Sequence, residues 1–203
     1  MMNNLYMHEI MDCLVEVIEA KDVYTKGHST RVADMSCDLA KEIGVSDDVY
    51  ELIHLAAHLH DVGKVGVPDQ ILNKNGKLTE EEYEKVKEHP VTGFNILMKS
   101  ESLKEIAKVV RHHHERFDGR GYPDKLAGEA IPFASRLIAI CDSIDAMVSD
   151  RPYRKALPWS VCVKEVITNK GLQFDSDIVS QMHDLWPYWM KSGNKINTKY
   201  KVI

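Results

Sequence analysis

Hydrophobic residues recur along most of this chain with the 3.6-residue period of an α-helix. In the first such segment, residues 5–21, one apolar face is predicted to contain Leu5, Ile10, Leu14, Val17 and Ile18. The same period predicts further helices at residues 29–43, 47–60, 79–98, 102–114, 133–149, 159–169 and 175–186. Strand-like alternation is absent apart from Val65-Gly66-Val67, so the pattern predicts an all-α fold.

Local signals define several helix boundaries. Ser29 is a candidate N-cap and Gly44 a candidate C-cap position for the helix at 29–43. The run from Thr79 to Glu82 has the pattern of a capping box, and Pro90 should end or bend the helix that follows. The long non-periodic stretch at 115–132 is rich in glycine and proline, and a loop of this length is usually functional.

Composition favours one globular unit. The chain has 203 residues, of which 44% are hydrophobic and 28% charged. We expect a single domain over residues 1–190, with a short lead-in at 1–8, and a polar tail at 191–203. No apolar run approaches the ~20 residues that span a bilayer, and the N-terminus lacks a signal-peptide pattern. A cytoplasmic protein without a membrane anchor is therefore expected.

Charge and cysteine usage narrow the chemistry further. The net charge of −5 does not favour nucleic acid, so an anionic ligand would need local basic groups. The four cysteines form no C-x-x-C pair and lie in apolar helical contexts, which indicates buried free thiols: Cys13, Cys37, Cys141 and Cys162. Ten histidines stand out, and they direct attention to metal binding.

The dipeptide His60-Asp61 lies at the predicted end of the helix at 47–60. Adjacent helical side chains point about 100° apart, so both can converge on one centre only near a helix end, which Gly63 supplies. Imidazole and carboxylate together suit Zn, Fe, Mn or Ni, whereas Ca and Mg prefer oxygen ligands. A surface pair is the alternative, because the dipeptide alone is a weak signal.

Longer motifs strengthen the metal interpretation. The segment from His60 to Pro68 is followed by Lys87-Glu88-His89-Pro90 and by a segment from His113 to Pro123 that contains Gly121-Tyr122-Pro123. From about residue 9 to about residue 184, this order resembles the HD-GYP family of HD phosphohydrolases. The resemblance implies the HD helical bundle with extra C-terminal helices, bound metal and hydrolysis of cyclic di-GMP.

By this resemblance, seven residues match the family's metal ligands: His28, His60, Asp61, His89, His113, His114 and Asp142. One ion would take His28, His60, Asp61 and Asp142, and the other the remaining histidines with Asp61 as a bridge. A water activated between the ions would attack phosphorus. Without a thiolate in the set, Fe or Mn is favoured, with Zn, Ni and Mg as alternatives. Tyr24 replaces the glutamate of three-metal members and favours two ions.

The resemblance also implies roles beyond the ligands. Asp61 and Lys64 are the candidate catalytic residues, and Lys64 would contact a phosphate oxygen. Arg151 and Arg154 match substrate-binding positions, with a basic surface turn as the alternative. Tyr122 would line the cleft or bond a phosphate.

Other side chains are expected to support the site. Asp118 would hold the glycine-rich loop in shape. The alternative to a substrate-binding role for this loop is that it only braces the paired histidines His113 and His114. Asp145, one turn after Asp142, would orient a ligand or Lys64. His54 and His58 are interpreted as helix-face residues, and His112 should point away from the ligands.

The predicted function is hydrolysis of cyclic di-GMP to linear pGpG. Further hydrolysis of pGpG to GMP is left open. Two alternatives remain: a phosphodiesterase for cyclic GMP-AMP, and a cyclic-dinucleotide receptor or docking module with little turnover. The family's glycine-rich loop also suggests a GGDEF-type or regulatory protein partner. A homodimer is a further expectation.

Overall fold

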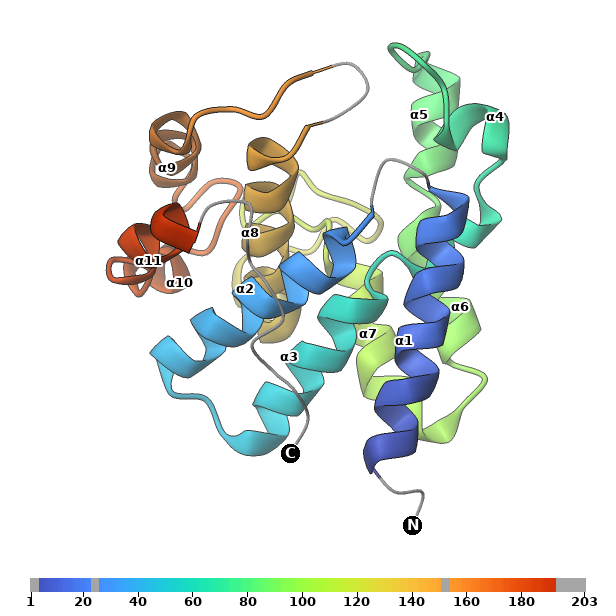
Figure 1. Ribbon diagram of the computed structural model, residues 1–203, viewed down its shortest axis with the longest axis horizontal. Helices are drawn as coiled ribbons and strands as arrows, with labels where there is room; N and C mark the ends of the chain where they lie inside the picture. Colours follow the sequence, from blue (N-terminus) through green and yellow to red (C-terminus); the bar gives the residue numbers. More distant parts are fainter. Residues whose placement is uncertain (1–3, 23–25, 151–153, 193–203) are drawn as a thin grey trace.

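The computed structural model describes residues 4–22, 26–150 and 154–192 (Figure 1). Among these residues, helices are joined by turns and loops, and an isolated β-bridge links Lys170 and Phe174. The all-α prediction is confirmed. The helices are α1 Asn4–Lys21, α2 His28–Ile43, α3 Asp47–Leu59, η1 Val62–Gly66, α4 Asp69–Leu72, α5 Glu80–Val86, α6 His89–Leu97, η2 Glu101–Leu103, α7 Lys104–His112, η3 Gly128–Ala130, α8 Phe133–Val148, α9 Trp159–Thr168, α10 Ser176–Ser180 and α11 Leu185–Ser192.

The core forms where α2 and α3, an antiparallel hairpin, pack with α7 and α8. Figure 1 shows α9, α10 and α11 gathered on one side of α8, and α1 with α4, α5 and α6 on the opposite side. Trp189 of α11 is fully buried, and its indole N–H donates to Asp38 of α2 at 3.0 Å. The C-terminal helices therefore complete the core.

Helix α1 corrects the predicted apolar face. Ile18 of the predicted face is buried, together with Met11 and Val15, whereas Ile10, Leu14 and Val17 are 51%, 41% and 62% exposed. The side chain of Leu5 lies outside the described part of the structure. The apolar residues of α1 lie on two neighbouring faces, so periodicity alone did not show which face meets the core. Cys13 is also exposed, unlike the three buried cysteines, which corrects its predicted burial.

Other helix boundaries follow the sequence signals with local differences. The capping box at Thr79 is formed with Glu82, and Gly44 ends α2 with a φ of 76°. The segment 79–98 is divided into α5 and α6, with Pro90 in the first turn of α6, where proline needs no hydrogen-bonding N–H. The predicted helix at 175–186 is also divided. Gly27, not Ser29, is the N-cap of α2.

Gly63 allows the segment after α3 to lie directly against α6. A Cβ atom at this position would be 1.9 Å from the carbonyl oxygen of His89 and 2.4 Å from the amide nitrogen of Gly93. No side chain fits in that space. The residues Val65-Gly66-Val67, which look strand-like in sequence, begin within the 3₁₀ turn η1. The close approach of Gly63 to α6 brings His60 and Asp61 beside the start of that helix.

Candidate metal centre

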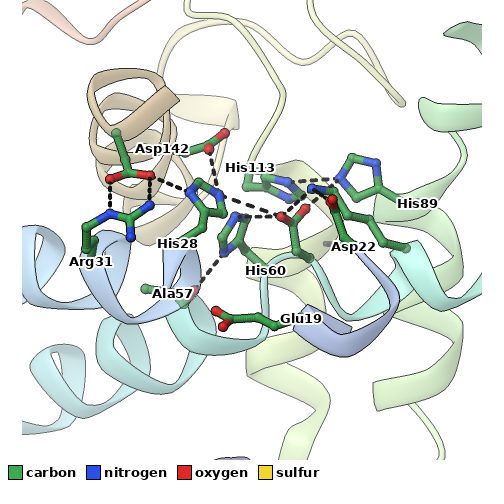
Figure 2. Close-up of polar contacts among 12 residues, drawn as sticks. Glu19, Asp22, His28, Arg31, Ala57, His60, His89, His113 and Asp142 are labelled. Atoms are coloured by element: carbon green, nitrogen blue, oxygen red, sulfur yellow. Dashed lines mark hydrogen bonds and ion pairs between the residues drawn. The ribbon is translucent and has the colours of Figure 1, made fainter. Parts of the chain in front are cut away.

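Three histidines at helix ends have their ring orientation fixed in the same way. In each, the Nδ1 atom lies close to the backbone carbonyl three residues earlier, at 2.7 Å for His60, 2.7 Å for His89 and 2.6 Å for His113. If Nδ1–H donates to that carbonyl, Nε2 is left unprotonated and available as a ligand. Figure 2 shows these rings converging from separate helices.

His28 is oriented by side chains instead. Its Nδ1 is 2.7 Å from Asp145 Oδ2, and Arg31 donates to the same carboxylate at 2.6 and 3.0 Å. Burial alone would raise the pKa of Asp145, but His28 and Arg31 lower it to about 2. The carboxylate stays charged and directs His28 Nε2 toward Asp142, whose Oδ1 lies at 3.3 Å.

Asp61 lies in the middle of this arrangement and is 5% exposed. Its Oδ2 atom is 3.7 Å from His28 Nε2 and 3.4 Å from His60 Nε2, whereas its Oδ1 atom is 3.5 Å from His89 Nε2. Burial would raise the pKa of Asp61, but Lys64 and the surrounding histidines hold it well below its usual range. The two oxygens of one ionised carboxylate thus face different imidazoles, His28 and His60 at Oδ2 and His89 at Oδ1.

Two compact ligand groups lie on either side of Asp61. His28, His60 and Asp142 have donor atoms within 4.8 Å of one another, as do His89, His113 and His114. The structure therefore brings all seven predicted ligand positions together.

The chemistry of these donors fits metal ions. The Nε2 atom of His60 is buried with no hydrogen-bond partner in the described part of the chain, which a metal would satisfy. Burial and the neighbouring His114 lower the pKa of His89 to about 3 and that of His113 well below its usual value. Both rings are held in the neutral form that binds metal.

Lys64 is enclosed by two carboxylates. Its Nζ atom is 2.8 Å from Asp61 Oδ2 and 3.1 Å from Asp22 Oδ2. Burial would lower the pKa of Lys64, but Asp61 and Asp22 raise it, so the ammonium stays charged. Asp22, only 4% exposed, was not predicted from the sequence. Its position just after α1 carries no motif that separates it from an ordinary helix-end carboxylate.

The glycine-rich loop packs against His114, one of the paired histidines. The Tyr122 ring centroid is 5.0 Å from that of His114. Asp118 accepts hydrogen bonds from the Arg116 guanidinium at 3.0 and 2.8 Å and from the Arg120 amide at 3.1 Å. Asp118 thus shapes the loop, while Tyr122 lies beside the ligand groups.

For the other predicted positions, the structure shows no contact with the two ligand groups or does not describe the residue. Arg154 donates to the carbonyl of Ala146 at 2.5 Å, at the C-terminal end of α8, so its contact with substrate stays a prediction. Arg151 and Tyr24 lie outside the described residues. Arg31, which holds Asp145, was not found from the sequence.

The other histidines of this region have different neighbours. His54 Nδ1 is 3.4 Å from Cys37 Sγ, and the His54 and His58 rings pack edge to face at 4.8 Å. His112 Nε2 is 2.9 Å from Asp124. None of the three belongs to the two ligand groups.

The fold and this cluster of buried histidines and carboxylates define a class of protein. The HD domain family matches residues 12–178, and the chain belongs to that family. The predicted HD-GYP type is confirmed by the relatives and structural neighbours taken together. HD domain phosphohydrolases use divalent metals, and the two ligand groups could bind them.

Three comparisons illustrate the relationship. The chain is 40% identical over 176 residues to a cyclic di-GMP phosphodiesterase of Thermotoga maritima, covering 86% of this chain and 48% of the relative. It is 38% identical over 157 residues to 3'3'-cGAMP-specific phosphodiesterase 3 of Vibrio cholerae, covering 77% and 34%. A solved cyclic GMP-AMP specific phosphodiesterase of Vibrio cholerae has the same fold, with a TM-score of 0.69 at 14% identity over 93% and 51% of the two chains.

The chain spans about half or less of the length of these curated relatives. Within the described ranges, we find no helix with the length and apolar character needed to cross a bilayer.

Proposed function

We propose that this chain is a metal-dependent phosphodiesterase that opens cyclic di-GMP to linear pGpG, with GMP as a further product. The observation that carries the proposal is the position of Asp61, whose two oxygens face separate ligand groups. A carboxylate placed in this way suits a bridge between two ions. The relatives named as cyclic di-GMP phosphodiesterases support the choice of substrate.

When bound, two divalent ions would supply Lewis acidity and activate a water at neutral pH. Because the donors are nitrogen and oxygen atoms without a thiolate, we favour Fe or Mn, with Zn, Ni and Mg as alternatives. Asp145 and Arg31 keep one nitrogen of His28 aimed at the site.

Lys64 is proposed to act on the substrate phosphate. An ammonium group has three N–H donors, of which Asp22 and Asp61 use two. The third is available for a phosphate oxygen, where it would stabilise developing negative charge. Tyr122, which packs beside His114, would form one wall of the substrate site.

Cyclic GMP-AMP is the second candidate substrate. Relatives of 36–38% identity are named as 3'3'-cGAMP-specific phosphodiesterases, close to the identity of those named for cyclic di-GMP. Both cyclic dinucleotides share the ring phosphates on which the reaction takes place, so the same centre suits either one. Their relative kcat/KM values measure which is preferred.

The test is turnover by protein purified without oxygen and reconstituted with Mn or Fe. Product chromatography should show pGpG released from cyclic di-GMP. His113→Ala should abolish turnover, whereas His112→Ala, at the adjacent histidine that contacts Asp124, should retain it. If the metal-loaded protein binds cyclic di-GMP but releases no product, the chain is a receptor and the enzymatic proposal is wrong.

A further inference from the structure

Among the described residues, the cations close to the candidate metal centre are already bonded to other groups of the protein. Lys64 lies between Asp22 and Asp61, and Arg31 is bound to Asp145. Arg154 donates to backbone carbonyls at the end of α8. A cyclic dinucleotide carries two phosphates, and only one of them can occupy the reaction centre at a time. A positive charge in another part of the site would therefore stabilise the second phosphate.

Lys87 supplies a candidate charge at the rim. Its Nζ atom lies 5.4 Å from the ring centroid of Tyr83 and 5.7 Å from that of Tyr122. The Tyr122 ring in turn packs against His114, a member of one ligand group. Tyr83, Lys87 and Tyr122 thus form a continuous row from the protein surface to the ligand groups.

The acidic partner of Lys87 is weakly held. Lys87 pairs with Glu84 three residues earlier on α5, and the Glu84 side chain is 60% exposed. Exposed pairs of this kind contribute little to stability, so a phosphate can replace the carboxylate at small cost. The Lys87 side chain itself is only 25% exposed. Its ammonium is thus partly withdrawn from water, where a phosphate contact is strengthened.

Tyr83 adds an aromatic surface next to this charge. Its side chain is 49% exposed, which is unusual for a large ring. Lys87, the C-cap residue of α5, follows Tyr83 by four residues, and its amide donates to the Tyr83 carbonyl, so the two side chains lie on one face. Purine bases stack on exposed aromatic rings, and such stacking does not depend strongly on which base is present.

We propose that Tyr83 and Lys87 form a second subsite, in which Lys87 binds the phosphate that is not being cleaved and Tyr83 stacks on a base of the substrate. This inference rests on the proposed function, because it requires a cyclic dinucleotide at the neighbouring metal centre. The subsite would favour cyclic dinucleotides over phosphodiesters that have only one phosphate.

Replacing Lys87 tests the phosphate contact. Lys87→Met keeps the length of the side chain but removes its charge, and it should raise KM for cyclic di-GMP about tenfold or more while kcat changes little. With bis(p-nitrophenyl) phosphate, which has a single phosphate, the loss should be at least several-fold smaller. Lys87→Arg should restore much of the affinity. Metal content per chain should match that of the unchanged protein.

Lys85 provides a matched control on the same helix. Like Lys87, Lys85 forms an ion pair with a glutamate three positions from it in sequence, Glu88. However, the Lys85 side chain is 59% exposed and points to another face of α5. Lys85→Met should leave KM unchanged. Tyr83→Ala should raise KM for cyclic di-GMP about tenfold, whereas Tyr83→Phe, which keeps the ring, should have a small effect.

Two results would overturn the subsite. The first is a KM for cyclic di-GMP that does not change in Lys87→Met. The second is an equal loss of activity on cyclic di-GMP and on bis(p-nitrophenyl) phosphate together with a loss of metal, which would show that Lys87 only supports His89.

Failure of the proposed function looks different, because the unchanged protein would then release no product from cyclic di-GMP. In that case calorimetry with cyclic di-GMP decides: weaker binding by Lys87→Met supports the subsite, and equal or absent binding refutes it.

Discussion

Charged side chains buried around the candidate metal centre are paired, and the partner of each limits what it can do. Lys64 is held between Asp22 and Asp61, so its ammonium is fixed at the edge of the site. Asp145, between His28 and Arg31, stays ionised and fixes one ring. Removing one member of a buried pair leaves the other without compensation and is strongly destabilising.

The Lys64–Asp22 pair gives a prediction for both rate and stability. Lys64→Met should lower kcat about 100-fold by removing the phosphate contact. It should also lower the free energy of unfolding by roughly 3 kcal/mol, because the buried Asp22 and Asp61 lose the ammonium between them. Adding Asp22→Asn should recover part of the stability but none of the rate. Urea denaturation and steady-state kinetics measure the two effects. Loss of metal from a folded Lys64→Met protein would indicate a structural role for this lysine instead.

Asp34 on α2 gives a prediction about pH. Burial, together with the nearby Asp38, raises the pKa of Asp34 from 3.8 to about 6. Its Oδ2 atom is buried and has no hydrogen-bond partner among the residues that the structure describes. The folded state therefore binds this proton more tightly than the unfolded state does, and stability falls as pH rises from about 4 through 6.

Asp34→Asn removes this charge and should increase the free energy of unfolding at about pH 7.5. We expect a gain of roughly 1 kcal/mol, reduced by solvent screening of the partly exposed carboxyl. At about pH 4 the gain should disappear, because the native carboxyl is then protonated. Urea denaturation at both pH values tests this, with Asp12→Asn on the exposed side of α1 as control. An equal gain at both pH values would contradict the electrostatic cause.

At the scale of helices, the sequence predicted the positions of most elements but not every contact between them. Periodicity and capping residues located α2, α3, α7, α8 and α9 to within a few residues. On α1, periodicity correctly included Ile18 in the apolar face but also included three exposed residues. Apolar residues occur on two neighbouring faces of α1, and only its packing against α3 and η1 distinguishes them. The division of the predicted helix 79–98 into α5 and α6, near Pro90, depends on the packing of α6 against η1, which is a tertiary contact.

Gly63 is the element-scale position most sensitive to change. In Gly63→Ala the new methyl group would overlap the backbone of His89, so η1 and α6 must separate. We expect a loss of about 2 kcal/mol or more in the free energy of unfolding and a lower metal content, because His60 and His89 move apart. Gly66→Ala in the same 3₁₀ turn meets only the Thr92 side chain, at 3.0 Å, and should cost less. Equal stability of the two variants would contradict this account.

At the scale of the whole molecule, the C-terminal helices and the glycine-rich loop support each other. The amides of Phe117 and Asp118 donate to the carbonyls of Gln173 and Leu172 at 3.1 and 2.7 Å, next to the start of α10. The loop beside His114 is therefore anchored by a segment more than fifty residues later in the chain. Such anchoring has no local sequence pattern.

The difference between local motifs and long-range contacts also explains which site residues could be predicted. All seven candidate ligand positions lie in ordered motifs, so the resemblance predicts them from the sequence. Asp22 and Arg31 act through contacts 42 and 114 residues away in sequence, to Lys64 and Asp145. Their roles depend on the packing of α1, α2 and α8, which no motif in the sequence specifies.

The central claim is that Asp61 joins two metal ions in one centre. Elemental analysis of protein purified without oxygen tests it directly, on the unchanged chain and on Asp61→Ala, with circular dichroism to confirm folding. We predict two ions per chain in the unchanged protein and fewer than one in Asp61→Ala, because both ligand groups lose a shared carboxylate. A folded Asp61→Ala protein that keeps two ions per chain would contradict the claim.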